Sequence, residues 1–339
     1  MNVSSQSANA PAMEVADTVV MNYEPVFGKI QGRSAYRITM FCAGLSPSAC
    51  LAELHAISEI LGNINQVFLI RFAGLGQFEN HKITSLPPNI GIIGDQANSH
   101  VTLLYDRQQY SVGWDMIAKS AVTVTRDLPP TEITVIQLLG LLNKCVDLNV
   151  VTSVIKRDPA LQYNLMRYLN SASISIRAHG GFRSFEQAVV LLGYNRLSRW
   201  LSMYLLRSNI VSAAPELYRA AITRGRQMEL LAGSCGIPES EGDSVFITGA
   251  LSLVDRLLGV QMEAVLAPLE ADITLDNALS EALLKEEGRY ASLLGFARAC
   301  EHGTEYELFE WVKRLGISGR EANLSIARGI CYAAGLEQP

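Results

Sequence analysis

The sequence has few of the residues that bind metals or form disulfide bridges. Its 339 residues include only six cysteines and five histidines, and no C-x-x-C motif occurs. The cysteines are widely scattered, and none lies at zinc-site spacing from a histidine. These absences exclude a disulfide-rich scaffold, and they predict reduced, mostly buried thiols in a cytoplasmic protein.

Long apolar runs and nucleotide-binding motifs are also missing. No uncharged segment approaches the roughly 20 residues of a membrane-spanning helix, so we expect a soluble protein with no membrane partner. The N-terminus lacks the basic and apolar stretches of a secretory signal. Neither a P-loop nor a G-x-S-x-G motif occurs, and Gly74-Leu75-Gly76 does not continue into a dinucleotide-binding fingerprint.

Charge is unevenly distributed along the chain. The overall charge of −5 is not that of a general polyanion binder, so we do not expect nucleic acid as a partner. Residues 156–226 contain 11 basic and 3 acidic residues, whereas residues 227–339 contain 8 basic and 18 acidic residues. Two interpretations stay open: the two segments pair within one domain, or the basic segment docks an acidic partner.

The pattern of the chain changes at Pro129-Pro130, which divides it into two expected domains. Residues 1–17 are small and polar, so we expect a disordered tail. Residues 18–125 have a mixed α/β pattern with one clear helix, Ser46–Leu61, and residues 126–339 have apolar residues at helical spacing. The β-like runs are Thr18–Met21, Tyr36–Phe41, Val67–Phe72, Ile90–Ile93 and Val101–Tyr105.

The most strongly marked helices lie between residues 151 and 206. Asp158 is a candidate N-cap, with Pro159 at the first helical position. Gly193 can end a second helix in the left-handed conformation. Trp200 lies in the apolar stripe of a third helix, where we interpret it as a core residue.

This region resembles the HDOD domain, an all-helical relative of the HD-domain phosphohydrolases that generally lacks their complete metal site. The resemblance extends from about Leu128 to the C-terminus and is carried by Arg157–Leu161, Arg167–Ala172 and Gln187–Gly193, continuing to Trp200. It implies a mainly structural role for the signature residues Arg157, Asp158, Pro159, Asn170, Ser171, Gly193 and Trp200.

The front segment resembles a shortened EAL domain, as in the EAL–HDOD (YuxH-like) family of bacterial signalling proteins. The resemblance places Arg37 where that family has a metal-binding Glu, Arg71 near the usual Asn, and Gly94 near a further Glu. The literal Glu281-Ala282-Leu283 lies in a helical pattern, so we interpret it as a coincidence. The expected fold class is therefore α+β, with a partial, EAL-barrel-like α/β domain over residues 18–125 and an all-α, HD-like domain over residues 126–339.

The sequence lacks the metal ligands of an HD phosphohydrolase. Such a site needs a His, an adjacent His-Asp pair and a further Asp. No His-Asp dipeptide occurs, and the helical part contains only His179 and His302. Where the resemblance places the pair, the sequence reads Thr223-Arg224-Gly225-Arg226, whose cations would repel a metal. We predict no catalytic residue, no metal site and no cofactor.

Basic side chains form the candidate binding face. Such a face would bind a protein partner, or a phosphate or cyclic dinucleotide as the alternative ligand. The same side chains could instead be solvated or pair with the acidic part of the chain. The residues of this candidate face are Arg196, Arg199, Arg207, Arg224 and Arg226.

The predicted function is that of a non-enzymatic adaptor in bacterial signal transduction. The family resemblance implies a link to cyclic-di-GMP or two-component signalling through protein partners. One alternative is an active metal-dependent phosphodiesterase or phosphohydrolase. A second alternative is a nucleotide receptor that uses the basic block, residues 156–226.

Overall fold

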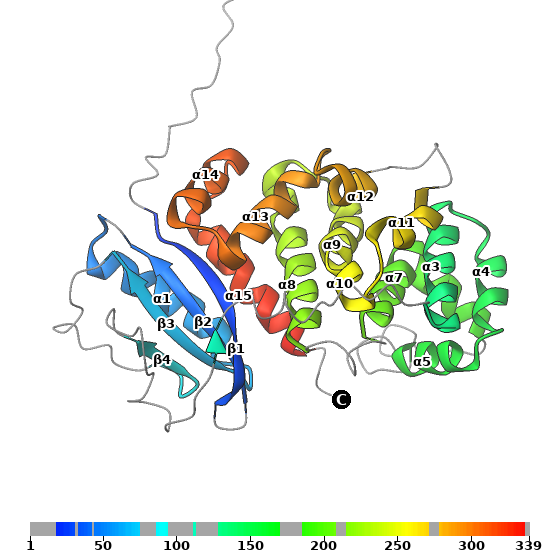
Figure 1. Cartoon of the computed structure of the whole chain (residues 1–339), viewed down its shortest axis with the longest axis horizontal. Helices are drawn as coiled ribbons and strands as arrows, with labels where there is room; N and C mark the ends of the chain where they lie inside the picture. The colour runs from blue at the N-terminus through cyan, green and yellow to red at the C-terminus, as the bar shows by residue number, and fades with distance from the viewer. Residues whose placement is uncertain are drawn as a thin grey trace, which may run out of the picture.

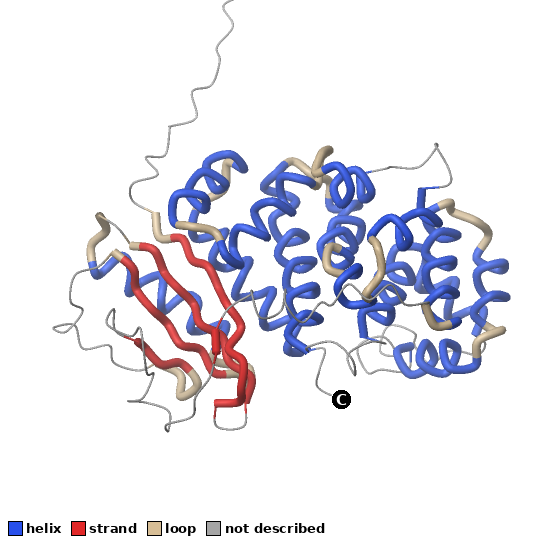
Figure 2. The backbone as a smooth tube through the Cα atoms, viewed as in Figure 1, coloured by secondary structure: helices blue, strands red, loops and turns tan. Residues whose placement is uncertain are grey.

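The computed structural model describes most of the helical part and the core of the front segment. The described residues are 18–30, 33–42, 44–74, 86–93, 111–112, 128–169, 185–207, 215–270 and 278–335. A mixed β-sheet lies at one end of the molecule, and helices form the rest (Figures 1 and 2). Within the described residues, no helix is both long and apolar enough to span a membrane.

The sheet has five strands in the order β4-β3-β2-β1-β5. Strand β1 pairs antiparallel with β2 and β5, whereas β2, β3 and β4 run parallel. Helix α1 connects the parallel strands β2 and β3, as a crossover connection requires. The strands are β1 (Val20–Ile30), β2 (Arg33–Phe41), β3 (Val67–Ala73), β4 (Ile90–Ile93) and β5 (Ser111–Val112).

The predictions for this segment are confirmed in part. Helix α1 spans Pro47–Leu61, and Ser46 caps it by accepting a bond from the Ala49 amide. The run expected at Thr18–Met21 is only the beginning of the longer strand β1. The fifth expected strand, Val101–Tyr105, lies outside the described residues.

One face of the sheet faces the main hydrophobic core. Because side chains alternate along a strand, Ile38 of β2 and Ile70 of β3 point to the same face. Both are fully buried and belong to the main core, together with Leu54 of α1. On the opposite face, Leu69 belongs to a smaller cluster with Val26.

The helices begin where turn residues predict. Helix α3 begins at Pro130, next to the expected boundary, and α8 begins at Pro215. The longer helices are α3 (Pro130–Asn143), α4 (Leu148–Ile155), α5 (Pro159–Leu169), α7 (Phe185–Arg207), α8 (Pro215–Ala232), α9 (Gly242–Leu251), α11 (Met262–Glu270), α13 (Ala291–His302), α14 (Glu305–Leu315) and α15 (Gly319–Gly335). Shorter pieces are α10 (Val254–Leu258), α12 (Ala278–Ser280) and a π-helical turn at Glu281–Lys285.

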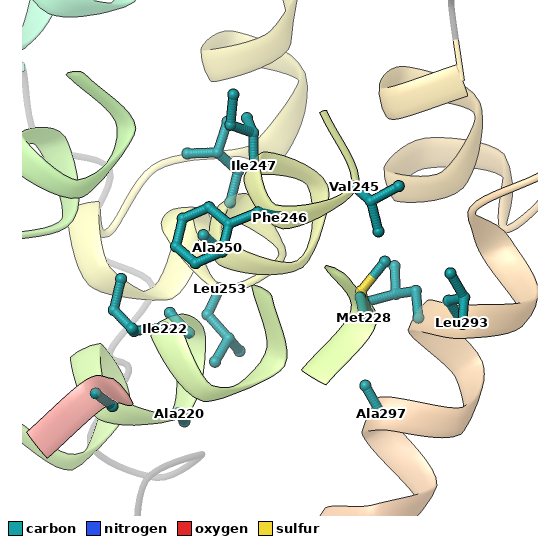
Figure 3. Packing of buried hydrophobic residues seen from close by; sticks show 14 of the residues in the cluster. Ala220, Ile222, Met228, Val245, Phe246, Ile247, Ala250, Leu253, Leu293 and Ala297 are labelled. Atoms are coloured by element: carbon teal, nitrogen blue, oxygen red, sulfur yellow. The ribbon is translucent and has the colours of Figure 1, made fainter. Parts of the chain in front are cut away.

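Helix α8 runs through the middle of the helical part, and its neighbours approach it very closely. Figure 3 shows Met228 of α8 among Val245 of α9 and Leu293 and Ala297 of α13. A Cβ at Gly225 would lie 2.6 Å from the carbonyl oxygen of Phe246. The backbones of α8 and α9 can therefore approach this closely only because residue 225 is a glycine.

The sheet and the helices share one core instead of forming two separate ones. The main cluster of buried apolar residues runs from β1 through α8 to α15. Polar contacts cross the same boundary: the Asn323 amide of α15 donates to the Val19 carbonyl (2.9 Å) and to the Glu53 carboxylate (3.0 Å). The expected front and helical domains therefore pack as one body.

The close helix crossing makes a direct prediction. Gly225→Ala or Gly249→Ala should force α8 and α9 apart and lower the free energy of unfolding by about 1–3 kcal/mol. Gly233→Ala is the control, because an added Cβ there meets nothing within 4 Å. It should change stability by no more than about 0.5 kcal/mol in the same denaturant titration. Equal stability of all three variants would contradict the tight crossing.

Candidate functional site

The candidate basic face is only partly a surface. Arg196 and Arg207 are exposed on α7, and their side chains make no ion pair with any described residue. Arg199, also on α7, is bound to carboxylates of neighbouring helices. Its guanidinium donates to both oxygens of Glu229 on α8 (2.8 and 3.0 Å) and to Asp243 on α9 (3.0 Å).

Aromatic rings complete the surroundings of Arg199. Its guanidinium carbon lies 3.7 Å from the ring centre of Phe246, and the Tyr332 ring lies on the same group. Arg226 donates to Glu229 (2.8 Å) and also lies over Tyr332. Arg199 and Arg226 therefore share the Glu229 carboxylate and the Tyr332 ring. Their charges are compensated by groups of the same chain.

Arg224 is not on a surface, and its prediction as part of an exposed face is wrong. It is 5% exposed and lies between α8 and α13. Its guanidinium donates to both Glu301 oxygens (2.5 and 2.6 Å) and to the Ser252 hydroxyl (2.9 Å). The hydroxyl of Tyr23, from β1, lies 3.5 Å from Glu301, so the buried pair also faces the sheet.

The pKa values of these groups follow from burial and pairing. Burial alone would lower the pKa of Arg199, but its hydrogen bonds and charge interactions with Glu229, Tyr332 and Asp243 together outweigh burial and raise this pKa. Burial alone would raise the pKa of the Glu229 carboxyl, but Arg199 and Arg226 hold it below its ordinary value of 4.5. Both groups are therefore charged at neutral pH in the folded protein.

Four of the signature residues, Asp158, Pro159, Gly193 and Trp200, have structural roles. Asp158 accepts a hydrogen bond from the Leu161 amide (3.0 Å), and Pro159 opens α5. Gly193 has φ +71° at the kink within α7, a left-handed φ that other residues rarely adopt. Trp200 is 6% exposed and lies against Tyr168 of α5. Of the other signature residues, Arg157 is exposed, and Asn170 and Ser171 lie outside the described residues.

The positions compared with an EAL metal site contain no carboxylate cluster among the described residues. Arg37 donates to Glu24 of the neighbouring strand (Nε to Oε2, 2.8 Å), directly across the β1–β2 ladder. Arg71 is half-buried on β3, and Gly94 lies outside the described residues. In the described part of the chain, no three His, Cys, Asp or Glu side chains gather closely enough to hold a metal ion.

The two histidines of the helical part do not form a site with Arg224. His302 is exposed at the last position of α13, and His179 lies outside the described residues. The place that the resemblance assigns to a His-Asp pair, Thr223–Arg226, contains instead the buried guanidinium of Arg224 and its carboxylate partner.

Comparison with known protein families identifies part of the helical region. The family model of the HDOD domain matches residues 128–295. Residues 128–295 form an HDOD domain. Helices α14 and α15, with the sheet, lie outside the matched range of this HDOD domain.

Two curated proteins are similar to part of the chain. The uncharacterized protein YuxH of Bacillus subtilis (strain 168) is 30% identical over 154 residues, which are 44% of this chain and 36% of YuxH. The cyclic di-GMP phosphodiesterase CdgJ of Vibrio cholerae (serotype O1, El Tor Inaba N16961) is 31% identical over 172 residues, which are 49% of this chain and 38% of CdgJ. The match thus spans well under half of either relative. No solved structure is significantly similar to this chain.

Reasoning from sequence missed the acidic partners of the HDOD arginines. Asp243 and Glu301 carry no motif and are far from Arg199 and Arg224 in sequence, whereas Glu229 follows Arg226 by three residues. Two signals were available: the helical spacing of Arg226 and Glu229, and the excess of acidic residues after residue 227, next to a basic segment. The ion pairs of Arg199, Arg224 and Arg226 show that part of this asymmetry is compensated within the chain.

Removing one partner of the buried pair should be costly. Arg224→Ala should lower the free energy of unfolding by about 3–5 kcal/mol, because it leaves Glu301 buried without a counter-charge. Arg196→Ala, at an exposed position of α7, should cost about 0.5 kcal/mol or less. Chemical denaturation of both variants measures the difference. Equal effects would mean that the Arg224–Glu301 pair does not support the fold.

The Arg199–Glu229 contact should make stability depend on pH. Because the pKa of Glu229 is lowered in the folded state, its contribution is complete above the unfolded value and is lost as pH falls through the folded value. The melting temperature of Glu229→Gln should therefore be lower than that of the wild type at neutral pH. The difference between the two melting temperatures should become smaller below about pH 4. Glu310→Gln, at an exposed position of α14, is the control. A gap for Glu229→Gln that stays constant with pH would refute this assignment.

Proposed function

We propose that this protein is a non-enzymatic signalling adaptor. It acts in the cytoplasm through protein partners, in a pathway linked to cyclic-di-GMP or two-component signalling. The HDOD domain, together with the name of one relative, a cyclic di-GMP phosphodiesterase, supports the link to this signalling system. The observation that carries the proposal is the buried ion pair between Arg224 and Glu301.

The buried pair occupies the place where the HD resemblance expects metal ligands. A hydrolytic HD site uses a metal ion to activate water. Here a fixed guanidinium lies at that position, and its two nitrogens already bind both oxygens of the nearest carboxylate. A divalent cation at this place would meet a like charge in surroundings of low dielectric constant, where repulsion is strong. This arrangement favours an HDOD domain that does no chemistry.

The front segment supports the same proposal. We interpret it as a shortened, catalytically inactive EAL-like domain. Its β2–α1–β3 unit, followed by the parallel strand β4, resembles the beginning of an α/β barrel. At the strand position compared with a metal-binding Glu, Arg37 is neutralised by Glu24 of β1. Position 37 therefore holds a cation where a metal site would need a carboxylate.

The alternative function is metal-dependent hydrolysis of cyclic-di-GMP. The observation that favours it is the name of CdgJ, which is 31% identical over the matched residues. A phosphodiesterase site requires several carboxylates that converge on its cations. The arginine pairs described above do not provide such a set.

An activity assay separates the two functions. The purified full-length protein is incubated with cyclic-di-GMP and Mg²⁺ or Mn²⁺, and the nucleotides are separated by chromatography. We expect no hydrolysis above a buffer control, while an active phosphodiesterase run in parallel degrades the substrate. Turnover that a chelator abolishes would refute the adaptor proposal and establish the enzyme.

A further inference from the structure

The described arginines fall into two groups. One group binds carboxylates of the same chain, as Arg199 and Arg224 do. Arg157 and Arg167 differ, because both are exposed and their side chains make no ion pair with any described residue. The carboxylate-bound arginines are Arg37, Arg199, Arg219, Arg224, Arg226, Arg289 and Arg298.

Exposed apolar side chains are concentrated on the helices around Arg157 and Arg167. Of the five large apolar side chains that are exposed within the described residues, four lie on α3, α4, α5 and α7, at the end of the molecule away from the sheet (Figure 1). These four are Ile133, Val150, Tyr163 and Val190, and Tyr163 is 64% exposed. The fifth, Tyr306, lies on α14 near the sheet.

Helical spacing places several of these residues on the outward side of their own helix. On α5, Ala160, Tyr163 and Arg167 are three and four residues apart and all exposed, while Leu161 and Leu165 are buried on the other side. On α4, Val150 and Ser153 are exposed in the same way, and their row continues to Arg157 in the turn before α5. Both helices therefore turn an arginine and a large apolar side chain outward.

An ion pair brings the first turns of α7 to this surface. Lys156, in the turn between α4 and α5, pairs with Glu186 in the first turn of α7. Val190 is exposed one turn further along α7. We call the surface formed by Val150, Arg157, Tyr163, Arg167 and Val190 the α4–α5 face.

The acidic groups beside the α4–α5 face are already engaged. Asp147 accepts a hydrogen bond from the Asn149 amide at the start of α4 (2.8 Å), and Asp158 caps α5. Glu186 is held by Lys156. Within the described part of the chain no carboxylate pairs with Arg157 or Arg167, so both guanidiniums are available to carboxylates of a partner.

We propose that the α4–α5 face binds an acidic segment of a protein partner that also carries apolar side chains. Tyrosine and arginine are the residues that most often dominate binding energy at interfaces. Exposed apolar side chains next to unpaired cations fit a ligand that offers both carboxylates and apolar groups. Arg196 and Arg207 are also exposed and unpaired within the described residues, but no large apolar side chain is exposed between residues 193 and 207.

This inference rests on the proposed adaptor function, and the test uses the full-length protein. A phage-displayed library of random peptides is selected on it, and the enriched peptides are synthesised. Their dissociation constants are measured by fluorescence anisotropy at low and high salt. We expect enrichment of Asp and Glu together with Leu, Ile or Phe, and binding that weakens as salt increases.

Matched variants locate the site on the protein. Tyr163→Ala/Arg167→Glu should weaken binding at least about tenfold, because it removes an aromatic anchor and reverses a charge. Tyr306→Ala/Arg328→Glu makes the same changes at exposed residues of α14 and α15 and should leave binding unchanged. Thermal melts check that both variants are folded. Val150→Ser/Arg157→Gln provides a second, milder variant of the same face, with the same expected direction.

Several results would overturn the proposal. One is the selection of peptides that are not acidic, or acidic peptides that bind the wild type and both face variants equally. A second is that the wild type binds cyclic-di-GMP specifically and only the variants of the α4–α5 face lose this binding. A third is that the wild type self-associates in light scattering and only these variants do not. If Arg196→Glu/Arg207→Glu loses the binding of acidic peptides instead, the α4–α5 face is not the binding site, and the proposed adaptor function is unaffected. The hydrolysis assay tests the adaptor function separately.

Discussion

The packing around α8 is the constraint on which the rest of the structure depends. Gly225 brings α9 into contact with its backbone, and a Cβ at Gly329 of α15 would lie 2.9 Å from the Thr223 carbonyl oxygen. Arg224 lies between these two contact positions of α8, Thr223 and Gly225, and binds Glu301 of α13. Three helices are therefore held against α8 at neighbouring positions, and larger side chains at these glycines would separate them.

The position of α13, α14 and α15 connects the HDOD helices to the sheet. Glu301 and Asn323 lie beyond the matched HDOD range, and both contact β1 or the residue just before it. The sheet buries Ile38 and Ile70 in the same core that α8 occupies. The sheet and the HDOD helices are therefore joined by continuous packing and by polar contacts.

Charge has two separate uses in this molecule. Arg199, Arg224 and Arg226 are bound to carboxylates from the acidic part of the chain, so their charge stabilises the fold. Arg157 and Arg167 lie on the outward side of α4 and α5, where exposed apolar side chains accompany them. The proposed adaptor function would need both a stable framework and a face that recognises a partner, and we assign the two groups of arginines to these two needs.

Local pattern in the sequence determined much of the fold. The turn chemistry of Ser46-Pro47, Asp158-Pro159 and Pro215 set the starts of α1, α5 and α8, because caps and prolines act on their own backbone neighbours. The stripe containing Trp200 was identified as core from helical spacing alone.

Only the tertiary structure decided which arginines pair with carboxylates of the same chain. Arg196 and Arg199 stand three residues apart with similar sequence surroundings, yet one is exposed and the other is bound to Glu229 and Asp243, which come 30 and 44 residues later. Such a pairing depends on how whole helices pack, and no local spacing encodes it.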